Sequence, residues 1–317
     1  MRWLSCMSAA AALLLLGTPP ARAADPPGGL KIGMLSGMFR DQKPAMIQAL
    51  AKPFRDLMTK HTGFNGDVEV VDDPLVLCDK LKDNKVHLGV FHGFEFAWAK
   101  QKCDDLVPII ITCPPGGCVQ GLVVVPADSP AKSLADLKDA PVLIPRGAKA
   151  HTLVFLDKLR DGLDAEAAKP TAMPDQTPDE VLTAVATGTA KAALVDGCAW
   201  EGYKVLHPGG GTALRVLAKS EEFPPAVLCY RKGSLTDDQV KQIRDGLIAS
   251  SKTATGKVLM TLWNLKGFEA PPKGYQTSLD DILKAYPPPK ADSKTSTAPA
   301  PTVSGGSRTT ATEPRDR

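Results

Sequence analysis

Lys149 and His151 stand at the start of a predicted helix, after a glycine loop and the short apolar strand at 141–144. The first N–H groups of a helix have no partner within it, and the helix dipole favours a negative charge at that end. The Lys149 ammonium adds a positive charge at the same place. We therefore predict that a ligand anion binds at Lys149, Ala150, His151 and Thr152.

A second group of polar side chains follows the predicted strand at 86–91. His92 and Glu95 come directly after this strand, in a glycine-aromatic loop that also contains Phe96. The carboxyl ends of strands in an open α/β sheet face the crevice in which ligands bind. We therefore expect His92, Glu95 and Phe96 at the ligand site. For Glu95, capping of the following helix is an equally good interpretation, because a carboxylate complements the helix dipole.

Asp196, Met38 and Phe39 complete the candidate set. Asp196 ends the predicted strand at 192–195, where it either contacts the ligand or caps a helix at 198–203. Met38 and Phe39 lie in the loop between the first strand and the first helix, which is expected to face the same crevice. The prediction is thus a ligand-binding site without catalytic residues, bound metal or cofactor.

The elements that position these side chains alternate between strand and helix. The first half of the chain contains predicted strands at 30–35, 68–71 and 86–91 and predicted helices at 44–60, 75–81 and 95–102. Such alternation indicates a parallel sheet covered by helices. Asp73 is the expected N-cap of the helix at 75–81, and Pro74 fits its first turn.

The pattern restarts after the β-branched strand at 121–125, which indicates that the chain crosses there into a second lobe. The expected strands are 141–144, 192–195, 213–219 and 226–230, and the expected helices are 133–138, 151–159, 178–187, 236–250, 253–265 and 278–286. The strand at 226–230 is expected to return to the first lobe, which favours ligand capture in a cleft over catalysis.

The two ends of the chain differ in composition from the rest. Residues 1–23 combine Arg2, a short apolar core and the sequence Ala-Arg-Ala, which predicts a cleaved secretory signal. The protein is therefore expected to be periplasmic or otherwise exported, and soluble after cleavage. Residues 287–317 are rich in Pro, Ser, Thr and charged residues with almost no large apolar side chain, so a disordered tail is expected.

Six cysteines remain after the predicted cleavage, and an oxidising compartment favours disulfides among them. Six cysteines allow 15 pairings, so the sequence alone does not fix the connectivity. The preferred pairs are Cys113–Cys118, Cys78–Cys103 and Cys198–Cys229. A metal site is less favoured, because CxxC pairs are absent and only five histidines occur.

The charge of the chain is nearly balanced, with 38 basic and 35 acidic residues and a net charge of +3. No basic stripe is interleaved with aromatic residues, which argues against a nucleic acid partner. The expected partner is a small-molecule ligand, and the protein is expected to be a monomer.

Four segments, in this order, resemble the periplasmic substrate-binding proteins of ABC transporters for phosphonate, phosphite and phosphate. They are LKDNKVHLGVFHGFEF at 81–96, GLVVVPADSPAKSLADLK at 121–138, DEVLTAVATGTAKAALVD at 179–196 and LRVLAKSEEFPPAVLCY at 214–230. The resemblance implies a type II periplasmic binding protein, an α/β fold whose two lobes are joined by two crossing strands and enclose a ligand cleft. Lobe I is expected at 30–119 plus 228–286, and lobe II at 120–227.

The chain departs from this family at its ligand loops. The family's Ser-Thr-Ser loop reads Lys-Ala-His at 149–151, and its Gly-Pro-aromatic-Ser-Tyr loop reads HGFEF at 92–96. Asp196 matches a family acidic residue that contacts a ligand amine. A zwitterion would satisfy both Lys149 and Glu95, so the expected ligand is small and polar, either phosphonate- or phosphate-like or zwitterionic.

The resulting functional hypothesis is a non-enzymatic binding protein that delivers this solute to the permease of an ABC importer. One alternative is a sensory or scaffold protein that has kept the fold but not transport. A cleft enzyme is less favoured, because the sequence lacks GxSxG, HExxH, P-loop and GxGxxG motifs.

Overall fold

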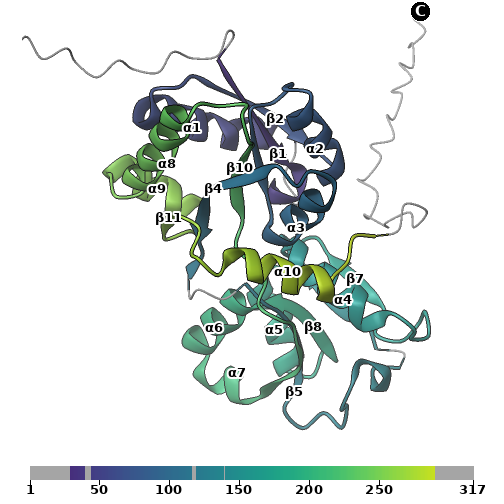
Figure 1. The fold of residues 1–317 in the computed structure, drawn as a ribbon. Coiled ribbons are helices and arrows are strands. Elements are labelled where there is room, and N and C mark those ends of the chain that lie inside the picture. Colours follow the sequence, from purple (N-terminus) through teal and green to yellow (C-terminus); the bar gives the residue numbers. More distant parts are fainter. Residues whose placement is uncertain (1–28, 40–43, 116–118, 139, 290–317) are drawn as a thin grey trace, which may run out of the picture.

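The computed structural model describes residues 29–39, 44–115, 119–138 and 140–289. These residues form two separate mixed sheets, each covered by helices, which lie one above the other in Figure 1. The chain builds four strands of the first sheet, then the whole second sheet, and returns to the first sheet for its last two strands. The two-lobed α/β fold predicted from the sequence is therefore confirmed.

Lobe I contains the six-stranded sheet with the order β11-β4-β10-β3-β1-β2. Its strands are β1 (Leu30–Leu35), β2 (Gly66–Val71), β3 (Leu88–Phe91), β4 (Leu106–Cys113), β10 (Val227–Arg231) and β11 (Gly267–Glu269). Its helices are the short 3₁₀ helix η1 (Ser36–Phe39), α1 (Pro44–Thr62), α2 (Pro74–Lys82), α3 (Gly93–Lys102), α8 (Asp237–Ser250), α9 (Ala254–Leu262) and α10 (Tyr275–Ala285). Strands β2, β1 and β3 are parallel, whereas β10 runs antiparallel to β3 and β4.

Lobe II contains the five-stranded sheet with the order β7-β6-β8-β5-β9. Its strands are β5 (Gly121–Pro126), β6 (Val142–Pro145), β7 (Pro170–Met173), β8 (Ala192–Asp196) and β9 (Leu214–Lys219). Its helices are the 3₁₀ turn η3 (Leu134–Asp136), α4 (Ala150–Arg160), α5 (Pro178–Ala186), α6 (Gly197–Leu206) and α7 (Pro208–Thr212). The apolar run of β5 occupies an inner position between β8 and β9, and its first five residues are buried.

Several helix starts follow local rules that are visible in the sequence. The Asp73 carboxylate accepts hydrogen bonds from the backbone N–H groups of Leu75 and Val76, so it caps α2 as predicted. Thr236 caps α8 by accepting from the Gln239 N–H. In contrast, the helix predicted at 133–138 is only the 3₁₀ turn η3, because Asp136 accepts from the backbone of Lys132 and Ser133 and closes a single turn.

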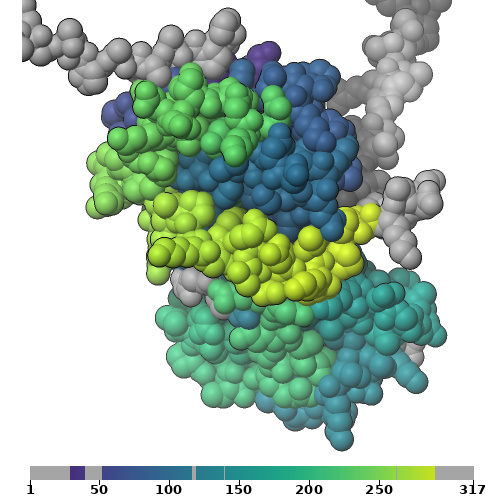
Figure 2. Space-filling view, viewed as in Figure 1, coloured from purple at the N-terminus to yellow at the C-terminus, as the bar shows by residue number. Residues whose placement is uncertain are grey.

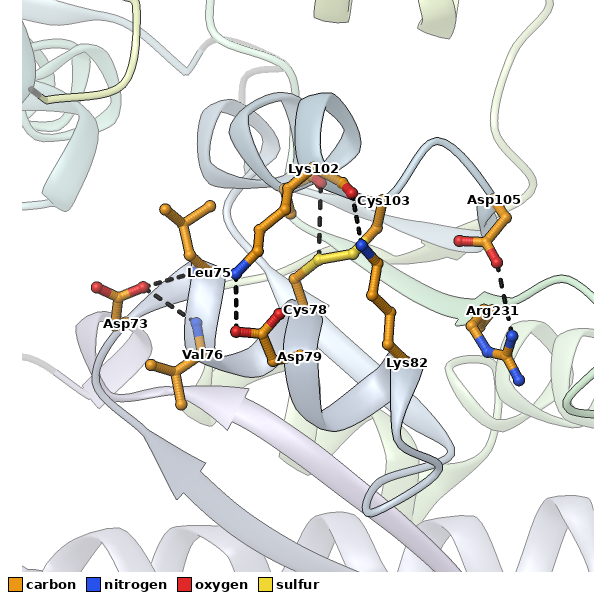
Figure 3. The surroundings of a disulfide bond; sticks show 11 residues. Asp73, Leu75, Val76, Cys78, Asp79, Lys82, Lys102, Cys103, Asp105 and Arg231 are labelled. Carbon is orange, nitrogen blue, oxygen red and sulfur yellow. Dashed lines mark hydrogen bonds and ion pairs between the residues drawn. A yellow bond between two sulfur atoms is a disulfide. The ribbon is translucent and has the colours of Figure 1, made fainter. Parts of the chain in front are cut away.

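The cysteines follow the prediction only in part. Cys78 in α2 and Cys103 at the end of α3 form the expected disulfide (Figure 3). The predicted Cys198–Cys229 bond is wrong, because Cys229 is a fully buried free thiol in β10, within the lobe I sheet. Cys113 is also a free thiol, which does not support the predicted bond to Cys118, and Cys118 itself lies outside the described residues.

The predicted signal at 1–23 lies outside the described residues, as does nearly all of the predicted tail, from residue 290 onward. Across the described ranges, we find no helix with the length and apolar character needed to cross a membrane.

Candidate ligand-binding site

A cleft of about 480 Å³ lies between the two lobes. Figure 2 shows lobe I above and lobe II below on one face of the molecule, with α10 lying across their junction. The lining residues come from both sheets and from the two segments that connect the lobes. Seven of the residues that the sequence predicts as ligand contacts are among them: Met38, Phe39, His92, Lys149, Ala150, His151 and Asp196. Their contact with a ligand stays a prediction.

His92 is held at the start of α3 by Glu95. The Glu95 carboxylate accepts hydrogen bonds from His92 Nδ1 at 2.5 Å and from the His92 backbone N–H at 3.3 Å. Because an ionised carboxylate only accepts hydrogen bonds, it fixes a proton on Nδ1. The ring stacks on Phe94, with 5.7 Å between the ring centroids, and lines the cleft. Glu95 therefore orients His92 and caps α3, and it is not among the residues that line the cleft.

The start of α4 forms the lobe II wall of the cleft. Gly147, with φ of 70°, turns the chain from β6 toward Lys149, which is the N-cap residue and makes no side-chain capping bond. Thr152 is the third residue of α4, and its hydroxyl donates to the Lys149 carbonyl at 2.7 Å. The first backbone N–H groups of α4 and the exposed Lys149 ammonium thus give this wall a positive character.

His151 is the most buried polar side chain of the cleft, with only 7% of its surface exposed. Burial is the largest of the effects that lower its pKa to about 3; the neighbouring His92 and Lys149 charges act in the same direction, and a hydrogen bond to the Gln120 backbone acts in the opposite direction. The ring contacts Phe223, 5.4 Å away between centroids. Its Nε2 atom is buried and has no hydrogen-bond partner among the described residues. His151 is therefore neutral at physiological pH.

Of the two roles that the sequence left open for Asp196, the structure shows helix capping, and ligand contact stays a prediction. Its carboxylate accepts from the Ala199 N–H at 2.9 Å and so caps α6, and the residue also lines the cleft. Because one carboxylate oxygen is used for capping, the other is the one left for a ligand.

An apolar wall, formed by lobe I, faces the positive wall. It includes two aromatic side chains in ring contact, Phe54 of α1 and Trp263 after α9, whose centroids are 5.7 Å apart. Met34, Leu265 and Phe268 extend this surface. The sequence analysis missed these residues, because a Phe or Trp in a helical stripe has the same pattern whether it packs in a core or lines a cleft.

Two other predicted contacts lie away from the cleft. Phe96 is fully buried, packs against Phe91 with centroids 5.9 Å apart, and belongs to the core of lobe I. Thr152 is 1% exposed and uses its hydroxyl within α4. In both cases, the side chain lies on the face of its helix that points into the core, whereas a nearby residue on the other face lines the cleft.

Within the described ranges, no group of three His, Cys, Asp or Glu side chains is arranged to hold a metal ion. Burial and the nearby Glu269 carboxylate raise the pKa of Cys113 to about 11, and complete burial raises that of Cys229 still further. Both therefore stay protonated at neutral pH and are poor nucleophiles.

This arrangement of two lobes, a cleft and a positively charged helix start agrees with the comparisons to known proteins. Residues 36–273 match the family model of the periplasmic substrate-binding proteins of phosphonate ABC transporters. The chain belongs to this family. Its members bind small molecules and work with the permeases of ABC transporters. No curated protein matches the chain.

Solved structures share the fold at low sequence identity. A binding protein component of an ABC phosphonate transporter from Pseudomonas aeruginosa is 17% identical, with a TM-score of 0.52 over 80% of this chain and 84% of that one. PhnD1 from Prochlorococcus marinus, in complex with methylphosphonate, is 14% identical, with a TM-score of 0.55 over 81% and 97%. A Xanthomonas citri protein bound to ATP is 16% identical, with a TM-score of 0.55 over 81% and 96%.

Proposed function

We propose that this protein is exported and captures an organophosphonate, that is, a tetrahedral oxyanion that carries an apolar substituent. It then delivers this solute to the permease of an ABC importer. The observation that carries the proposal is the division of one cleft into two unlike walls. The start of α4 with Lys149 suits the anion, whereas the Phe54–Trp263 wall suits an alkyl or aryl group.

The charges of the cleft support an anionic head group. Lys149 and the first N–H groups of α4 supply positive potential. Glu95 bonds to His92, and Asp196 shares its carboxylate with the α6 backbone, so the acidic groups nearby are already partly compensated. A ligand amine is therefore not required for the anion to bind, although the second oxygen of Asp196 could accept from one.

The size and lining of the cleft support an apolar substituent. A head group of one phosphorus and three oxygens fills only a fraction of about 480 Å³. Burial of an added phenyl group against Trp263 and Phe54 is worth about 1.5–3 kcal/mol, which corresponds to roughly 10- to 100-fold in affinity.

Calorimetric titration with phosphate, methylphosphonate and phenylphosphonate tests this proposal. We expect phenylphosphonate to bind at least about ten times more tightly than methylphosphonate. Trp263→Ala should remove most of that difference, because it removes the aromatic wall and leaves the start of α4 intact. Equal affinity for the two phosphonates would show that the apolar wall takes no part in binding.

The anion contact is tested with a lysine variant and a matched control. Lys149→Gln should weaken phenylphosphonate binding by about 3- to 10-fold, because it removes one charge at the helix start. Lys191→Gln is the control, since Lys191 precedes β8 and so lies at the end of that strand opposite Asp196. Equal weakening by both variants would indicate a general effect of net charge and not a contact.

A further inference from the structure

The buried Nε2 atom of His151 is unexplained by the folded chain itself. Buried polar atoms are normally hydrogen-bonded, and an unsatisfied one costs about 1–3 kcal/mol. His151 is 7% exposed, lines the cleft and belongs to the first turn of the 11-residue helix α4. Within the described ranges, nothing bonds to its Nε2. A ligand in the cleft is therefore the natural partner of this atom.

The ring geometry sets which kind of partner Nε2 can take. The ring hydrogen-bonds to the Gln120 backbone, and since Nε2 is unpartnered, this bond must use Nδ1. A backbone carbonyl only accepts, so Nδ1 carries the proton. A neutral imidazole has one proton, and burial keeps this ring neutral. Nε2 is therefore a hydrogen-bond acceptor.

The other groups around the cleft do not change this role. The titratable side chains that line the cleft with this ring include His92, which is bonded to Glu95, Lys149 at the start of the same helix, and Asp196 at the end of β8. Of these, His92 and Lys149 act on the charge of His151. Positive charge on His92 or Lys149 opposes a second proton on His151. The acceptor at Nε2 is thus maintained by its surroundings.

We propose that Nε2 of His151 accepts a hydrogen bond from the acidic O–H of a singly ionised phosphonate, so that the cleft selects R–PO₂(OH)⁻. The doubly ionised phosphonate and the sulfonates, R–SO₃⁻, have no O–H and would place oxygen lone pairs against the Nε2 lone pair. This inference rests on the proposed function, because it specifies the ionisation state of the head group that the same cleft binds.

The expected discrimination is large, because a site with a buried polar group rejects an analogue that leaves that group unpaired. Phenylphosphonate and benzenesulfonate have similar shapes, and only the phosphonate carries an exchangeable proton in the neutral range. At pH 6, we expect phenylphosphonate to bind about 30- to 100-fold more tightly than benzenesulfonate.

Calorimetric titrations of both probes between pH 5.5 and pH 9 test the inference on the full chain. Benzenesulfonate reports how the protein's own groups respond to pH. The ratio of the two Kd values therefore isolates the ligand proton. We expect this ratio to fall toward one as phenylphosphonate loses its second proton, by about tenfold per pH unit above that ionisation.

His151→Asn removes the acceptor without removing the bond to Gln120. The asparagine amide N–H can still donate toward Gln120, but no acceptor remains at the position of Nε2. The two probes should then bind within about threefold of each other. His207→Asn, which alters a half-exposed ring on α6–α7, should leave the ratio unchanged. Should His151→Asn fail to fold, ¹⁵N NMR of the wild-type imidazoles is the second measurement. A proton on Nδ1 is expected at pH 7, with the Nε2 signal shifting when phenylphosphonate is added.

The outcomes separate the two proposals. Equal binding of the two probes by the wild-type protein, a Kd ratio that is unchanged in His151→Asn, or a proton found on Nε2 would each overturn the role of His151 alone. If neither probe binds at any pH, the proposed function fails and the inference fails with it.

Discussion

At the scale of single residues, His151 shows how burial changes the chemistry of a side chain. A histidine in the unfolded chain titrates near its ordinary pKa of 6.5, whereas burial lowers the pKa of folded His151 to about 3. Between these values, the unfolded state binds a proton that the folded state does not. The folded state therefore loses stability as the pH falls from about 6.5 toward 3. Above pH 6.5, His151 causes no such loss.

We predict that His151→Asn makes acid destabilisation less steep. One proton corresponds to a slope of about 1.4 kcal/mol per pH unit, and the variant should lose up to this much of the slope between pH 6 and pH 4. Urea denaturation at several pH values measures it. His207→Asn is the control, because the exposed pair of His207 with Asp179 should contribute little to stability. Identical slopes for wild type and His151→Asn would refute the buried neutral ring.

The residue scale also shows where sequence reasoning was limited. His92, Lys149 and His151 could be placed at the site because strand ends and helix starts are locally encoded. The direction of each neighbour was harder to assign. Glu95 and Phe96 are adjacent in the sequence, yet one bonds to His92 and the other is buried in the core. That outcome depends on how α3 packs against the sheet and not on residue type.

At the scale of elements, the disulfide joins α2 to the end of α3 opposite His92. Figure 3 shows Cys78 and Cys103 beside two further links between these helices, Lys102–Asp79 and Lys82 to the Lys102 carbonyl, both at 2.7 Å. These polar links are solvent-exposed and contribute little. The covalent bond closes a loop with a sequence separation of 25, so it dominates the coupling between the two helices.

We predict that the double variant Cys78→Ala and Cys103→Ala lowers the free energy of unfolding by about 3 kcal/mol, because the unfolded chain regains the entropy of the closed loop. Urea denaturation under non-reducing conditions measures this change. Cys113→Ala, at a free and partly exposed thiol, should cost clearly less. Unfolding midpoints that agree between wild type and double variant would contradict a stabilising bond.

Strand β4 illustrates an element that the sequence analysis did not identify. It contains Pro108, which has no N–H to donate and counts against an inner strand. In the structure, the register between β10 and β4 shifts between Leu228 and Cys229, and Cys229 stands opposite Pro108. This β-bulge accommodates the proline, and only the pairing with β10 reveals it.

At the scale of the whole molecule, a cluster of three side chains spans the lobes. Lys158 of α4 bonds to Glu221 at 2.8 Å, and its Nζ lies 4.4 Å from the centroid of the Tyr286 ring at the end of α10. The Tyr286 hydroxyl donates to Glu221. Burial opposes ionisation of Glu221, but these hydrogen bonds outweigh it and lower the Glu221 pKa. Trp98 of α3 donates to the Tyr286 carbonyl, which ties the cluster to lobe I.

We predict that Lys158→Ala weakens the contact between the lobes and so lowers ligand affinity. The ligand binds between the lobes, and every contact that stabilises the closed form relative to the open form adds to the affinity. The expected loss in phenylphosphonate affinity is about 3- to 10-fold, with a larger radius of gyration in X-ray scattering. Lys169→Ala, whose partner Glu166 lies in the same lobe, is the control. A radius that does not change in Lys158→Ala would refute the bridging role.

The sequence by itself indicated the two-lobed α/β class and many helix starts, because capping, turns and hydrophobic periodicity depend on neighbours within a few residues. The family was indicated separately, by the resemblance of four longer segments. Asp73 is the predicted cap of the helix at 75–81, and it caps α2 in the structure. The sequence also predicted that the start of α4 belongs to the ligand site, and in the structure Lys149, Ala150 and His151 line the cleft. Anion binding there stays a prediction.

Only the tertiary structure decided which side chains form the rest of the cleft and which cysteines pair. Phe54 and Trp263 lie far apart in the sequence and meet as one wall of the cleft. Cys229 remains a buried thiol because β10 lies between β3 and β4, away from Cys198 at the start of α6. Contacts of this kind depend on the order of strands and the packing of the two lobes, which local sequence patterns do not encode.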